Sequence, residues 1–121
     1  MISIEQVEES IQWFFATARQ LGQARRQMVL TERLTERMKA LVMKKYVDLP
    51  VSAQEREAKA SPEMHQAYID EADAAGEYEM LRVLKIGHEA RIEAWRTMES
   101  TARALSKPMQ APQEDRYVAN R

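Results

Sequence analysis

The chain has 121 residues, of which 45% are hydrophobic and 31% charged, and its formal net charge is −1. This length suits a single domain, and the mixture of apolar and charged residues is typical of amphipathic helices. The absence of cysteine excludes disulfides and thiolate metal sites, and the small net charge excludes a polycation that binds nucleic acid through bulk charge alone.

The sequence indicates neither export nor membrane insertion. The first ten residues, M-I-S-I-E-Q-V-E-E-S, are acidic and lack the basic-then-apolar order of a signal peptide. No apolar run approaches the roughly 20 residues that span a bilayer. We therefore expect a cytoplasmic protein without a membrane partner.

The first predicted helix covers residues 3–48. Ser3 with Gln6 has the S-x-x-Q pattern of a capping box at its start. Apolar residues then alternate at spacings of three and four, as in a coiled coil, and after Arg25 the series resumes with a shift, as a stutter would produce. Gly22 is the one residue at which a bend is expected. The expected apolar positions are Ile4, Val7, Ile11, Phe14, Ala18, Leu21, Leu30, Leu34, Met38 and Leu41, and the series reaches Lys45 as its last position.

Two further helices and a tail follow. Residues before Pro50 avoid helical angles, so the first helix must end there. Ser52 with Glu55 predicts a second capping box and a short helix over 52–60, and Ser61 followed by Pro62 predicts a helix over 62–106. Residues 108–121 contain two prolines and no periodicity, which predicts a flexible tail. The expected apolar stripe of the third helix is Tyr68, Ala72, Ala75, Tyr78, Leu81, His88, Ile92, Trp95 and Ala102.

These elements predict an all-α fold in which residues 1–107 form a long antiparallel helical hairpin, resembling a coiled coil. Residue i of the first long helix would then face residue about 109 − i of the second. Basic residues dominate 19–45 and acidic residues dominate 54–79, so complementary charge blocks would meet near the connector. On this view most basic residues are interhelical partners or solvated surface.

The middle of the hairpin is the exception, because basic residues would face basic residues there. Like charges brought together cost energy unless an anion neutralises them. We call this set the basic girdle and expect it to surround His88. It is a candidate site for nucleic-acid phosphates, although acidic residues of a neighbouring subunit could also satisfy it. Its members are Arg19, Arg25, Arg26, Arg82, Lys85 and Arg91.

Consecutive aromatic residues indicate self-assembly. Trp13, Phe14 and Phe15 point in different directions around one helix. The facing rule sets Phe14 against Trp95 and leaves Trp13 and Phe15 partly uncovered. We expect a homo-oligomer with Trp13 and Phe15 as interface anchors. Coverage by the short helix or the tail is the alternative, and base stacking by Trp13 is a further one.

The sequence holds no recognisable catalytic motif. His88-Glu89 begins like H-E-x-x-H, but residue 92 is isoleucine, so the zinc motif fails. No E-x-x-H pair suits a di-iron bundle, and no glycine-rich phosphate loop is present. We expect no enzymatic activity, no catalytic residue, no metal and no cofactor.

The segment Y-I-D-E-A-D-A-A-G-E-Y-E-M-L-R-V-L-K-I-G-H-E-A-R-I-E-A-W-R-T-M-E-S-T-A-R-A (68–104) resembles small all-helical bacteriophage proteins. Across 1–107, the order of long helix, connector helix and long helix is similar to that of UvsY-type phage recombination mediators. This resemblance implies a ring-like oligomer that binds single-stranded DNA. It also implies a host-cytoplasmic protein whose partners are a RecA-like recombinase and a single-strand-binding protein. No site residue of the family is carried over.

Two functions therefore compete. In the first, the chain is a recombination mediator whose basic girdle contacts phosphates without sequence specificity. In the second, it is a non-enzymatic protein–protein interaction module with no nucleic-acid role, such as a phage adaptor, an assembly component or an inhibitor of a host protein.

Overall fold

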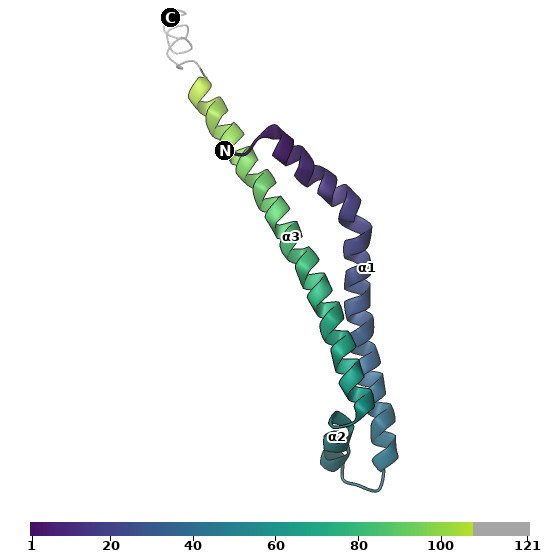
Figure 1. The fold of residues 1–121 in the computed structure, drawn as a ribbon. Helices are drawn as coiled ribbons and strands as arrows, with labels where there is room; N and C mark the ends of the chain where they lie inside the picture. Colours follow the sequence, from purple (N-terminus) through teal and green to yellow (C-terminus); the bar gives the residue numbers. More distant parts are fainter. Residues whose placement is uncertain (108–121) are drawn as a thin grey trace, which may run out of the picture.

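The computed structural model describes residues 1–107, and all regular structure in that range is helical (Figure 1). Two long α-helices, α1 (Ile4–Met43) and α3 (Pro62–Ser106), are separated by a 3₁₀ turn, η1 (Lys44–Tyr46), and a short helix, α2 (Val51–Lys59). The prediction of an all-α fold with a long helix pair and a short helix is confirmed. The tail predicted for residues 108–121 lies outside the described residues.

Both long helices begin at the predicted caps. Ser3 and Gln6 form the reciprocal capping box: the Gln6 backbone N–H donates to Ser3 Oγ at 3.2 Å, and the Ser3 N–H donates to Gln6 Oε1 at 2.9 Å. Ser61 caps α3, where the Met64 N–H donates to Ser61 Oγ at 3.2 Å and Pro62 occupies the first turn. These bonds satisfy N–H groups that have no partner within the helix.

The predicted start of the short helix is wrong. α2 begins at Val51, and no side chain caps it. Pro50 already has the extended geometry that precedes a helix, with φ −58° and ψ 154°, so Ser52 lies inside the first turn. The Gln54 side chain donates instead to the Leu49 carbonyl at 2.8 Å. The first helix also ends earlier than residue 48, because its last turn tightens into η1.

The seam of α1, meaning its buried and half-buried residues, keeps a spacing of three and four without interruption. The expected stutter is therefore wrong. Four seam positions are the polar residues Ser10, Thr17, Thr31 and Thr35, which an apolar pattern does not count, while Ile4, Ile11, Leu34 and Leu41 remain exposed. The α1 seam consists of Val7, Ser10, Phe14, Thr17, Leu21, Ala24, Met28, Thr31, Thr35, Met38 and Val42, and the half-buried Trp13, Lys39 and Met43 lie directly beside it.

The seam of α3 follows the same spacing and only partly matches the expected stripe. Tyr78, Leu81, His88, Ile92 and Trp95 are at least half-buried, as predicted. Tyr68, Ala72 and Ala75 are exposed, because the seam passes one residue before each of them. Through the helix centre the α3 seam consists of Met64, Ala67, Glu71, Ala74, Tyr78, Leu81, Lys85, His88, Ile92 and Trp95.

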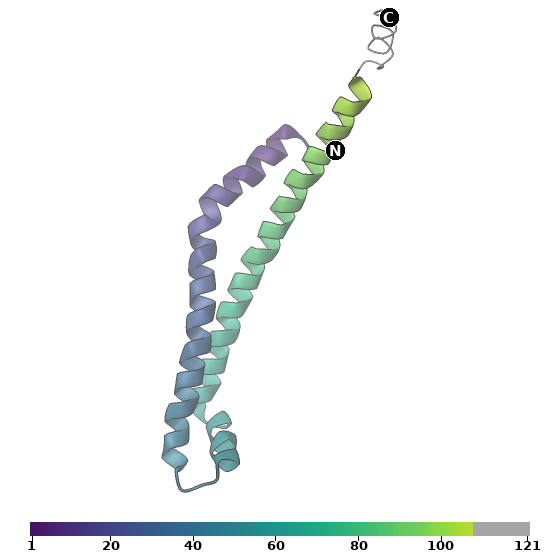
Figure 2. The same cartoon turned by 180° about the vertical axis from the view of Figure 1, so that it is seen from behind.

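Contacts between the long helices depart from the expected facing rule. Ser10 contacts His88, Arg25 contacts Tyr78 and Thr35 contacts Ala67, so residue numbers rise in α1 as they fall in α3. Their sums lie near 100 instead of 109. Figures 1 and 2 show α1 bowing away from the straighter α3, and a bowed path uses more residues over the same length. Phe14 therefore lies near His88, with ring centroids 6.3 Å apart, and the expected pairing with Trp95 is wrong.

A compact core joins the three helices at the connector end. Val42, Ala58 and Met64 form a buried cluster, against which Met38, Met43 and Tyr46 pack. Ser61 strengthens this corner, because its hydroxyl donates to the Ala58 carbonyl at 2.7 Å while accepting from Met64. The connector is therefore held by both apolar packing and capping.

Replacing Ser61 by alanine is expected to lower the free energy of unfolding by about 1–2 kcal/mol, because a cap and a buried hydrogen bond disappear together. Ser52→Ala is the matched control, since Ser52 is exposed and caps nothing, and it should change stability by less than about 0.5 kcal/mol. Urea unfolding followed by circular dichroism measures both. Equal effects of the two substitutions would contradict the capping role.

Candidate nucleic-acid interface

The basic girdle divides into two halves of different character. On α3, each base has a carboxylate beside it: Arg82 Nη2 lies 2.6 Å from Glu79 Oε1, and Lys85 Nζ lies 3.7 Å from Glu89 Oε1. Arg91 Nη1 lies 3.7 Å from Glu9 Oε2. Basic residues of α3 are thus partly neutralised within the chain, which the facing rule did not anticipate.

The Arg82–Glu79 pair is bidentate, since Arg82 Nε also donates to Glu79 Oε2 at 2.9 Å. Hydrogen bonding from Arg82 lowers the pKa of Glu79 below its ordinary value, and hydrogen bonding to Glu79 raises the pKa of Arg82. A carboxylate with a lowered folded-state pKa stabilises the fold above its unfolded pKa. That contribution is lost as pH falls through the folded value. Arg82 is therefore engaged at neutral pH, although an exposed pair adds little stability.

The arginines of α1 differ from those of α3. Arg19, Arg25 and Arg26 are exposed, and no acidic side chain within residues 1–107 makes an ion pair with any of them. Arg25 donates to Tyr78 Oη at 3.3 Å, with its guanidinium carbon 5.5 Å from the ring centroid. Its charge is held in place by this contact without being neutralised. These three arginines are the part of the girdle best suited to an external anion.

Arg19 and Arg26 lie seven residues apart, which places them on the same face of α1 about 10 Å from each other. Both are about 150° from the seam around the helix, and Arg25 flanks them. Arg19 and Arg26 therefore form a line along the outer face of α1, while Arg25 lies about 100° around the helix from Arg26 and contacts Tyr78 of α3. We call these three exposed residues the arginine row, and they do not converge on a pocket. Such a row can contact successive phosphates of a strand, one at a time.

His88 belongs to an aromatic cluster between the helices. Its ring stacks on Trp13 with centroids 4.5 Å apart and an angle of 25°, and Phe14 meets Trp13 edge-on at 5.4 Å. Ser10, which is fully buried, lies with its Oγ 2.8 Å from His88 Nδ1. His88 thus packs between α3 and α1 and contacts residues of α1. It is not directed at solvent, where an external anion could reach it.

Arg91 completes this contact between the helices. Its Nη1 donates to Ser10 Oγ at 3.3 Å and to the Gln6 carbonyl at 3.2 Å. The Ser10 hydroxyl can accept from Arg91 while donating to His88 Nδ1. Sequence reasoning missed Ser10, and it expected Glu9 to lie against Arg96, Arg103 and Lys107 instead of Arg91. The signal in the sequence was that Ser10 comes three residues after Val7 and four before Phe14, a seam spacing.

The two expected interface anchors are in different environments. Trp13 is half-buried, and His88 of the same chain covers one of its faces. Phe15 is 79% exposed. Only Phe15 therefore lacks cover within the described part of the chain.

Ser10→Ala is expected to cost about 1–2 kcal/mol of unfolding free energy, because His88 and Arg91 both lose their partner at a buried position. Ser100→Ala is the control, since Ser100 is exposed on α3 and should be near neutral. Thermal unfolding at one fixed protein concentration compares the two variants. A Ser10→Ala protein as stable as wild type would show that the hydrogen bonds do not fasten the helices.

Within residues 1–107, no three His, Cys, Asp or Glu side chains gather as metal ligands. None of the helices over that range combines the length and the apolar character that crossing a bilayer requires.

In comparisons with known proteins, no family model, no curated protein and no solved structure matches the chain. The assignment of a function therefore depends on the residues themselves.

Proposed function

We propose that the chain forms an antiparallel helical hairpin, assembles with copies of itself, and binds single-stranded DNA through phosphate contacts without sequence specificity. The observation that carries this proposal is the row of Arg19, Arg25 and Arg26, three exposed arginines without an acidic partner in the described residues. Arginine suits this role because its planar guanidinium can bind two phosphate oxygens at once.

A flexible single strand fits a row of arginines better than a rigid duplex does. A single strand can bend to bring successive phosphates onto α1, whereas duplex recognition by a helix depends on the dimensions of a groove. An oligomer would repeat the three arginines and so raise the effective concentration of the second and later contacts. Many weak contacts can thereby add up to useful affinity.

The cellular role that we propose follows from the resemblance to UvsY-type mediators. A protein of this kind assists recombinase loading or strand exchange, with a RecA-like recombinase and a single-strand-binding protein as partners. No catalytic residue and no cofactor are needed, because the contribution is to hold a strand. The proposed location is the host cytoplasm.

Fluorescence anisotropy of a labelled strand of about 30 nucleotides, titrated with the full chain at several salt concentrations, tests the DNA-binding half of the proposal. Micromolar or tighter binding that weakens steeply with salt would support phosphate contacts. Light scattering on the same samples gives the number of subunits. No binding at low salt by a well-folded protein would refute the DNA-binding role.

A non-enzymatic protein–protein interaction module is the second candidate. It is favoured by the engagement of Arg82, Lys85 and Arg91 with carboxylates of the same chain, which reduces the charge that DNA could contact. Proteins that stay bound to the chain after nuclease treatment would favour this candidate, provided that the anisotropy titration shows no DNA binding.

A further inference from the structure

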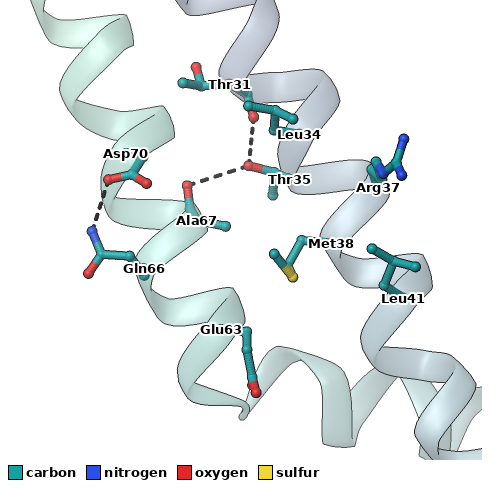
Figure 3. A pocket seen from close by; sticks show the side chains of 10 residues that line it. All are labelled: Thr31, Leu34, Thr35, Arg37, Met38, Leu41, Glu63, Gln66, Ala67 and Asp70. Carbon is teal, nitrogen blue, oxygen red and sulfur yellow. Dashed lines mark hydrogen bonds between the residues drawn. The ribbon is translucent and has the colours of Figure 1, made fainter.

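A groove of about 420 Å³ lies between α1 and α3 near the connector (Figure 3). Leu34, Met38 and Leu41 of α1 line it together with Ala67 of α3. Figure 3 shows Met38 pointing into the space between the helices. The groove therefore has an apolar floor that a single helix pair leaves open.

Exposed apolar side chains continue along the same flank of the helix pair. Leu34 and Leu41 are seven residues apart, and Leu30 lies one helical turn before Leu34. On α3, Leu84 comes fourteen residues, or two heptads, after Asp70 of the groove, so the two residues lie on the same face of α3 about 21 Å apart. Met80 lies on that face one turn before Leu84. We call this set the leucine face: Leu30, Leu34, Leu41, Met80 and Leu84, all exposed.

The rims of the groove carry opposite charges. Arg37 stands on the α1 rim and Asp70 on the α3 rim. Arg37 makes no ion pair within residues 1–107, and Asp70 accepts only from the Gln66 side chain, at 2.9 Å. Asp73 continues the acidic rim at the adjoining end of the groove. The flank thus offers both apolar surface and unmatched charges of both signs.

Residues 108–121 cannot fill the groove of the same molecule. Even when fully extended, a segment of this length spans only about 50 Å. The helical residues from Asp70 to Ser106 extend about 55 Å along α3. Residues 108–121 are therefore excluded as the occupant of the groove in their own molecule.

We infer that a second copy of the chain packs its own leucine face against this one, about a twofold axis parallel to the helices. Such an axis sets α1 of each copy against α3 of the other, at the same height. Each Arg37 then meets Asp70 of the partner subunit, and the two apolar floors cover each other. This inference rests on the self-assembly half of the proposed function. It moves the interface away from Phe15, which lies 19 residues, or about 29 Å, along α1 from Leu34 and about 100° around the helix from it.

Light scattering and sedimentation velocity of the full chain across a concentration series test the surface. Wild type should have a mass of at least two chains, and Leu34→Glu should raise the dissociation constant at least 10-fold. Ile86→Glu is the control, because Ile86 is similarly exposed but lies about 160° around α3 from Leu84. A monomeric wild type, or equal weakening by both substitutions, would overturn the inference.

A charge exchange tests the arrangement without altering the apolar floor. The Arg37→Asp variant alone and the Asp70→Arg variant alone should each be monomeric. In a dimer of either variant, both contacts between residues 37 and 70 of the two copies would join like charges. Mixing the two variants should restore a dimer, since every contact across the axis then joins opposite charges. If Arg37 instead paired with Asp70 of its own chain, mixing the two variants could not restore the ion pair. A mixture that stays monomeric, or single variants that associate like wild type, would refute the twofold packing.

The two halves of the proposal can fail separately. Circular dichroism on the single variants shows whether the helices survive, and anisotropy with the labelled strand is measured on the same samples. Restored mass without DNA binding would support the interface and refute the DNA-binding role. DNA binding by a wild-type protein that stays monomeric would support the DNA-binding role and refute the interface.

Discussion

The double variant Arg25→Glu, Arg26→Glu is expected to lose single-stranded DNA binding while remaining helical. Both side chains are exposed on α1 and contribute to no ion pair within residues 1–107. The substitution removes the exposed Arg25–Tyr78 contact, which costs about 0.5–1 kcal/mol and should leave the protein helical. Reversal replaces two attractive interactions with phosphates by two repulsive ones in every subunit. Removing one arginine–phosphate interaction should reduce the slope of log K against log salt by about 0.7. Anisotropy at several salt concentrations measures both the affinity and the slope.

A control of equal charge change separates the arginine row from bulk electrostatics. Arg96→Glu with Arg103→Glu alters the net charge by the same amount on the exposed far end of α3. Affinity should fall at least 10-fold more for the α1 variant than for this control. Equal reductions would mean that net charge alone governs binding, and an unchanged α1 variant would remove the row from the interface.

The largest stability loss is expected from Met64→Ala. Met64 is 0% exposed, and its side chain joins α3 to Val42 of α1 and Ala58 of α2. Truncation removes apolar packing and leaves a cavity, which for buried methionine costs about 2–5 kcal/mol. A domain with a total stability of about 5–15 kcal/mol would lose much of it. Urea unfolding at one fixed protein concentration gives the difference.

Met80→Ala is the matched control, because Met80 lies in the same helix with 58% of its surface exposed. Its free energy of unfolding should change by less than about 0.5 kcal/mol in the monomer. Measurement at a concentration below the dimer dissociation constant avoids any contribution from the proposed interface. A Met64→Ala protein that loses no more than Met80→Ala would show that the connector core does not hold the helices.

Helix positions could be read from the sequence because their signals are local. Ser3 with Gln6, and Ser61 with Pro62, place the starts of both long helices to within a residue, whereas α1 ends at Met43, before the predicted residue 48. The capping box predicted at Ser52 is absent because Pro50 occupies the N-cap position and α2 begins at Val51, so Ser52 already lies inside the first turn. A local capping pattern therefore predicts the start of a helix well when only one residue in the segment can act as the N-cap.

The face that each helix buries was harder to predict, because polar residues occupy the seam. Thr31 donates to the carbonyls of Gln27 and Met28, and Thr35 donates to that of Thr31. Once its hydroxyl is satisfied within its own helix, a threonine can turn its methyl group to the neighbour at little cost. A pattern based only on apolar residues therefore predicted that the exposed leucines are buried, and it did not include the buried threonines of the seam.

The candidate site was predicted only in outline, since contacts depend on how α1 bows. A shift of several residues in the facing rule sets Arg91 beside Glu9 and His88 beside Trp13. Arg91 thereby acquires a partner that a straight hairpin would have placed elsewhere, whereas Arg82 and Lys85 pair with Glu79 and Glu89 of their own helix. The residues that keep an unmatched charge, Arg19, Arg25 and Arg26, all belong to α1.

The small side chains in the seam affect how the protein responds to temperature. Among residues 1–107, the buried apolar side chains are Val7, Ala24, Val42, Ala58, Met64, Ala74 and Leu81, and three of these are alanines. Unfolding one chain thus exposes little new apolar surface, and its heat capacity should rise by less than the usual value of about 12–15 cal/mol/K per residue. A small heat-capacity change flattens the curve of stability against temperature. The free energy of unfolding of a single chain would then be modest and nearly constant over a wide range of temperature. Apolar surface buried between copies would increase the heat-capacity change, and so make stability depend more steeply on temperature.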